Sequence, residues 1–178
     1  MTTDPARFYG PAFGLPLGAG MLLRDCPYPV PAADQLRYST LLGKVLVLTH
    51  ECDMDDNNER QFNDTVLVLP ITPLELFCEQ LDQEHGTGAW GGLVPQVAGG
   101  NVFRLMYLPP IPANIAPDML PLGGIVDFNT IAYAPIPWLA HFGTEHVCSL
   151  SALGLRFLDY KLETHLRRPK AVPLWFQE

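Results

Sequence analysis

The sequence predicts an α+β domain, built as a small, partly open β-barrel or a strongly bent antiparallel sheet with two helices. Two apolar runs, residues 44–49 and 65–69, are rich in Val and Leu and lack polar alternation, which is typical of buried strands. Abundant Gly and Pro keep the other strands short. Helical spacing predicts helices over about 73–84 and 151–167. A length of 178 residues suits a single domain, 1–178.

Composition narrows the functional classes. The 11 Lys and Arg and 19 Asp and Glu give a net charge of −8, which argues against nucleic acid as a partner. The first ten residues lack the basic and apolar regions of a signal peptide, and the apolar run at 45–48 is far below the roughly 20 residues that span a bilayer. We therefore expect a cytoplasmic protein without a membrane partner and with its 4 cysteines reduced.

The first half of the chain yields three strands and one helix. Residues 21–23 are the best strand candidate before the buried strands 44–49 and 65–69. Thr72 and Glu75 form a predicted capping box, with Pro73 at the first helical position. The predicted helix ends at a glycine and turns one apolar face to the core: Leu74, Phe77, Cys78 and Leu81.

Glycine and proline residues interrupt the second half of the chain more often. The six glycines of residues 86–101 predict a flexible loop, and residues 102–108 a strand with Phe103, Leu105 and Tyr107 on one face. Five prolines within residues 108–124 predict an extended surface connection. Residues 125–128 and 131–133 are expected to form a hairpin across Asn129-Thr130.

The closing helix begins at Ser149 or Ser151 and ends at Arg167-Arg168-Pro169, where the arginines suit the negative end of the helix dipole. Its apolar positions recur at helical spacing: Leu155, Leu158, Leu162 and Leu166.

Titratable groups gather where the strand 44–49 ends. His50, Cys52 and Asp53 are catalytic candidates, because a histidine that lowers the pKa of a cysteine makes a nucleophile. His141 or His146 could replace His50 in that role. The alternative is a buried Cys52 that packs the strand end, with Asp53 hydrogen-bonded to its own backbone.

A repeated His-x-Cys pattern suggests zinc. In an extended strand, positions two apart point to one side, so His50 with Cys52 and His146 with Cys148 could supply a tetrahedral His2Cys2 site. Chance occurrence of the two doublets is the alternative, since the chain holds 4 Cys and 5 His.

Two oppositely charged segments, the acidic residues 51–64 and the basic residues 156–170, could contact partners. Residues 51–64 carry six acids and one Arg, and this acidic loop could dock a basic partner. Its spacing of Asp53, Asp55, Asn57 and Asp64 superficially matches a calcium loop, although Asn58 stands where glycine is required. The candidate partner-binding residues are Asp53, Asp55, Asp56, Glu59, Trp90, Arg167 and Arg168.

Thr49-x-x-Cys52-Asp53 after an apolar strand, together with Ser149-Leu150-Ser151 and the helix end at Arg167, resembles a loose group of uncharacterised bacterial and phage proteins with a T-x-x-C-D signature. The resemblance implies a compact β-rich domain and no established activity. The chain is also faintly similar to the SH3-like barrels of PemK/MazF toxins, which would imply RNA cleavage.

We therefore expect a non-catalytic protein-binding module of a bacterial or phage system that uses its acidic, Gly-rich and Pro-rich segments. Another protein is the expected partner, and self-association is compatible with the sequence. One alternative is a metal- or cysteine-dependent hydrolase centred on Cys52, with zinc as the candidate metal. The other is a nucleic-acid-processing protein like the PemK/MazF toxins.

Overall fold

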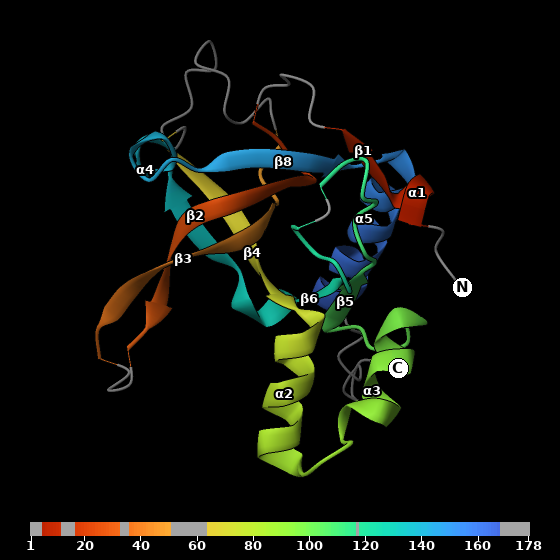
Figure 1. Cartoon of the computed structure of the whole chain (residues 1–178). Helices are drawn as coiled ribbons and strands as arrows, with labels where there is room; N and C mark the ends of the chain where they lie inside the picture. The colour runs from red at the N-terminus through yellow and green to blue at the C-terminus, as the bar shows by residue number, and fades with distance from the viewer. Residues whose placement is uncertain (1–4, 12–16, 33–35, 51–63, 117, 168–178) are drawn as a thin grey trace, which may run out of the picture.

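A computed structural model describes residues 5–11, 17–32, 36–50, 64–116 and 118–167. These residues form an α+β fold with five α-helices and an eight-stranded antiparallel sheet in the order β1-β8-β2-β3-β4-β6-β5, with β7 also paired to β4 (Figure 1). The predicted class and antiparallel pairing are confirmed. The sheet does not close into a barrel and is larger than the SH3-like fold that we predicted, and the described residues form five helices instead of the two predicted.

The strands are β1 (Tyr9–Pro11), β2 (Met21–Pro31), β3 (Tyr38–Val47), β4 (Thr65–Pro73), β5 (Leu105–Leu108), β6 (Gly124–Asp127), β7 (Ala132–Pro135) and β8 (Glu145–Leu150). The helices are α1 (Pro5–Phe8), α2 (Leu74–His85), α3 (Trp90–Ala98), α4 (Ile136–His141) and α5 (Ala152–Leu166), with a 3-10 turn η2 (Phe128–Thr130).

The strand predicted at 44–49 is the end of β3, and it is buried on both faces as expected. Val45, Leu46 and Val47 are fully buried. Leu46 packs into an α5-side cluster with Leu158 of α5, whereas Val45 and Val47 pack into a β7-side cluster with Ala134 of β7. Alternate side chains of one strand thus enter opposite cores, which explains why this run shows no polar alternation.

The predicted hairpin across Asn129-Thr130 is wrong. β6 and β7 do not pair with each other; both pair with β4, over Ile71–Pro73 and Thr65–Val68 respectively. The Asn129 N–H donates to the Asp127 carboxylate at 2.9 Å, and the Thr130 hydroxyl donates to the Asp127 carbonyl at 2.7 Å. These bonds fold η2, so the chain jogs and continues along β4 instead of reversing.

Both predicted helices are confirmed as α2 and α5, but only one predicted cap is present. The Ser151 side chain accepts from the Gly154 N–H at 3.3 Å. The capping box at Thr72 is wrong, because β4 continues through Pro73 and α2 has no side-chain cap. The predicted apolar face of α2 is only half-buried.

Two Gly- or Pro-rich segments differ from their predictions. Residues 86–101 contain helix α3 instead of a loop, because Val97 and Leu93 pack against Leu105 and outweigh the low helix propensity of glycine. The Pro-rich connection 108–124 is only partly a surface segment, since three of its apolar side chains are buried in the α5-side cluster: Ile111, Met119 and Leu120. The predicted strand 102–108 begins only at Leu105, and Phe103 is exposed.

No helix in the described part of the chain is long and apolar enough to cross a membrane.

Candidate functional site

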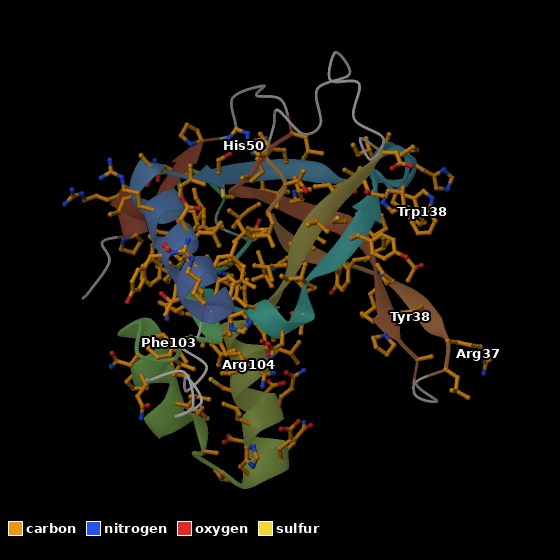
Figure 2. All side chains as sticks on the ribbon, turned by 180° about the vertical axis from the view of Figure 1, so that it is seen from behind. Arg37, Tyr38, His50, Phe103, Arg104 and Trp138 are labelled. Atoms are coloured by element: carbon orange, nitrogen blue, oxygen red, sulfur yellow. The ribbon has the colours of Figure 1, made fainter. Side chains whose placement is uncertain are left out.

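Most of the acidic and catalytic candidates lie outside the described residues: Cys52, Asp53, Asp55, Asp56, Asn57, Asn58 and Glu59. The cysteine-centred, calcium-like and acidic docking sites therefore stay predictions. His50 is described and exposed. It follows the C-terminal end of β3, whereas Tyr38 begins this strand at its other end (Figure 2).

The zinc prediction is not tested, because one of its four residues, Cys52, is outside the described residues. His146 and Cys148 both lie in β8, but a bulge interrupts the pairing with β2, so that Leu23 is opposite His146 and Leu22 is opposite Cys148. Regular two-residue periodicity is therefore broken between them. Burial raises the pKa of the Cys148 thiol to about 12. Within the described residues no group of three or more His, Cys, Asp or Glu side chains could hold a metal.

The His146 ring lies beside the Ser149 hydroxyl and the Cys148 backbone. The His146 Nε2 atom lies 2.9 Å from the Ser149 hydroxyl and 3.1 Å from the Cys148 carbonyl oxygen. With the hydrogen on Nε2 the ring donates to the Cys148 carbonyl, and with the hydrogen on Nδ1 the Nε2 atom accepts from the Ser149 hydroxyl. Burial lowers the pKa of His146, which keeps the ring neutral.

The remaining candidate partner residues are widely placed. Trp90 begins α3 and is exposed. Arg167 caps α5 and pairs with Glu163 at 2.7 Å, and Arg168 is outside the described residues. Phe157 and Lys161 of α5 contact the chain near α3, where the Lys161 ammonium donates to the carbonyls of Gly100 and Val102, both at 2.8 Å.

A stronger candidate site involves the hairpin of β2 and β3, which projects beyond the rest of the sheet (Figure 1). In an antiparallel strand, successive residues direct their N–H groups to opposite edges. Prolines have no N–H, so the ladder to β3 must use the residues between Pro27, Pro29 and Pro31. The Ala32 N–H donates to the Arg37 carbonyl at 2.8 Å. The N–H and C=O groups of the even-numbered residues of β2 therefore point toward β3.

The three prolines therefore lie on the free edge of β2, which faces β7. β8 pairs with this edge only over Met21–Arg24, and β7 lies beside it farther along. With no N–H at three successive edge positions, β2 cannot form a regular ladder with β7. This explains why the curled sheet stays open at this seam.

An apolar groove of about 550 Å³ occupies the open seam. It is lined by Tyr28, Pro29, Val30, Pro31, Tyr38, Pro70, Asn129, Thr130, Ile131, Ala132 and Tyr133, and none of these residues is charged. Two of the tyrosines are well exposed, Tyr38 by 76% and Tyr133 by 54%. Exposed aromatic rings around an uncharged hollow are typical of a binding surface.

Tyr28 forms the inner wall of the groove. A Cβ atom at Gly43 would lie 3.0 Å from the Tyr28 hydroxyl and 3.1 Å from its ring, so the ring packs over this glycine. Burial raises the pKa of Tyr28 and the nearby Cys26 adds to the effect. The sequence signal for this site is the alternation Pro27-Tyr28-Pro29-Val30-Pro31, which marks a proline-bearing strand edge.

No known protein-family model matches the chain, and no curated protein matches it significantly. Its function is therefore inferred from its own residues.

Proposed function

We propose that the protein is a protein-binding module whose groove between β2 and β7 takes an extended, proline-containing segment of another protein. The observation that carries the proposal is an uncharged groove walled by tyrosine and proline side chains. Domains that recognise proline-rich segments use aromatic-lined grooves of this kind, because a polyproline II segment is already extended and loses little entropy on binding.

The same prolines disfavour a β-strand as the ligand. A strand added to the edge of β2 would direct carbonyl groups at Pro27, Pro29 and Pro31, which offer no N–H donor. A polyproline II segment makes no regular backbone ladder and keeps its backbone solvated. It can therefore contact this edge through side-chain packing alone.

The exposed tyrosines supply the expected affinity. A tyrosine buries about 150–250 Å² when fully covered, and Tyr133 is 54% exposed in the free protein. Covering the remaining ring at about 25 cal/mol per Å² gives on the order of 2 kcal/mol. One such contact is expected to dominate a weak, transient complex.

The test is titration of an oligoproline peptide, followed by calorimetry or by the amide NMR signals of residues 129–133. We expect Tyr133→Ala to weaken binding at least about tenfold, or about 1.4 kcal/mol. Tyr160→Ala is the matched control, because Tyr160 on α5 is 55% exposed but remote from the groove. A glycine-serine peptide of equal length controls for non-specific association.

Equal weakening by both variants, or equal binding of both peptides, would contradict the proposal. Binding of oligoproline that leaves the groove signals unchanged would also contradict it, because the ligand would then lie elsewhere.

A further inference from the structure

The opposite edge of the same hairpin has different chemistry. The Leu48 N–H donates to the Leu67 carbonyl of β4 at 2.9 Å. The N–H and C=O groups of the even-numbered residues of β3 therefore point to the edge on which β4 lies. Pairing with β4 covers only Val45–Val47. No other described strand pairs with this edge of β3, so the N–H and C=O groups of Tyr38, Thr40 and Leu42 point outward.

This β3 edge carries no charged side chain from Tyr38 to Gly43. The sequence from Tyr38 to Gly43 is YSTLLG, in which Leu42 is 52% exposed and Tyr38 76%. A projecting two-stranded ribbon with an open edge gains stability from a further strand. The whole chain carries a net charge of −8, so an uncharged edge is where two copies can approach with the least repulsion.

We propose that a second copy of this chain pairs antiparallel with the β3 edge, with Thr40 of each copy on the two-fold axis. In this register Tyr38 lies opposite Leu42 of the second copy, an aromatic–aliphatic pair that favours the sheet. All three outward N–H groups and all three outward C=O groups of Tyr38, Thr40 and Leu42 find partners in the other copy. The two hairpins form one four-stranded sheet.

The β2 edge cannot serve this purpose, because its prolines lack the donors that a ladder requires. The hairpin therefore has one edge for self-pairing and another for the groove. Tyr38 also lines the groove, but the self-pairing depends on the outward backbone groups of β3 and not on the hollow between β2 and β7, so this inference does not rest on the proposed function. The two proposals can fail separately.

The experiment is disulfide trapping across the axis, with sedimentation of the unmodified full chain over a range of concentrations. Directly opposite residues of a hydrogen-bonded pair have Cα atoms about 5.5 Å apart, which a disulfide spans. Thr40→Cys should therefore form a covalent dimer under mild oxidation. In the matched variant Ser39→Cys, the two cysteines are diagonal neighbours whose Cα atoms are about 7–8 Å apart. This is beyond the usual Cα–Cα span of a disulfide, so we expect cross-linking about tenfold slower.

The unmodified chain under the same oxidant measures any background from its native cysteines. A chain that sediments only as a monomer would overturn the proposal, as would equal cross-linking of the two variants. Dimerisation without oligoproline binding would contradict the proposed function alone, and oligoproline binding by a strict monomer would contradict this inference alone.

Discussion

The two edges of the β2–β3 hairpin have the same backbone geometry but opposite binding chemistry. On β2, every outward position from Pro27 to Pro31 lacks an N–H, whereas on β3 the outward positions from Tyr38 to Leu42 keep both donors and acceptors. The difference shows that alternate residues of one strand can decide whether a sheet stops or continues. It also explains how an open groove persists beside a curled sheet, since the β2 edge cannot pair with β7.

The largest expected effect breaks the hairpin itself. Leu41 directs its N–H to β2, so Leu41→Pro removes a ladder bond and should cost the hairpin about 2 kcal/mol. Thr40→Pro, one residue away, removes only an outward N–H and should cost less than about 1 kcal/mol. The free energy of local opening is measured by amide hydrogen exchange at Val30, at concentrations where the chain is monomeric.

Equal loss of protection in the two proline variants would show that the edge assignment of β3 is wrong. Thr40→Pro should also abolish self-association, because its N–H lies on the proposed axis.

A smaller effect is expected on the proline edge. Pro29→Thr restores an N–H that faces β7 and should narrow the seam, weakening oligoproline binding about fivefold, or about 1 kcal/mol. Pro121→Thr is the control, because Pro121 is exposed and lies outside the groove. Calorimetric titration measures both variants. Unchanged affinity of Pro29→Thr would show that the missing donor does not keep the groove open.

The smallest effect concerns the inner wall of the groove. Gly43→Ala should displace the Tyr28 ring and lower the free energy of unfolding by less than about 1 kcal/mol. Gly10→Ala in β1 is the control, because no atom lies within 4 Å of the new Cβ. Displacement exposes Tyr28, so its pKa should fall toward the ordinary value. Ultraviolet titration against pH measures this shift, and an unchanged tyrosine titration would contradict the packing of Tyr28 on Gly43.

The raised pKa of Tyr28 also makes the free energy of unfolding depend on pH. The folded-state pKa of Tyr28 is raised, so its contribution to the free energy of unfolding is fully present below about pH 10. That contribution is lost as the pH rises through the folded-state pKa. Gly43→Ala should make this alkaline loss smaller, and urea unfolding at two pH values measures the difference.

Sequence patterns were sufficient where side-chain periodicity decides the structure. The run around Val45 identified a strand that is buried on both faces, and Ser151 identified the start of α5. They failed where tertiary packing overrides local preference. Val97 draws a glycine-containing segment into α3, and Leu120 draws a Pro-rich connection into the core. Neither burial can be read from neighbouring residues.

The candidate site was missed for a related reason. Abundant prolines predicted only short strands outside the two apolar runs, yet Pro27, Pro29 and Pro31 all lie in the 11-residue strand β2. Their two-residue spacing is compatible with a strand whose free edge bears the prolines, but the sequence does not show that β7 lies opposite that edge. Tyr133 joins the groove only because η2 carries the chain along β4.

The pairing of β4 has a consequence for biosynthesis. One edge of β4 pairs with β3, which precedes it, but the other edge waits for β7 and β6, and β1 waits for β8, whose Leu150 is opposite Tyr9. Contacts so distant along the chain form slowly. A ribosome must therefore release most of the polypeptide before this sheet is complete. Until then β4, whose side chains enter both core clusters, exposes its apolar surface to chaperones and to neighbouring nascent chains.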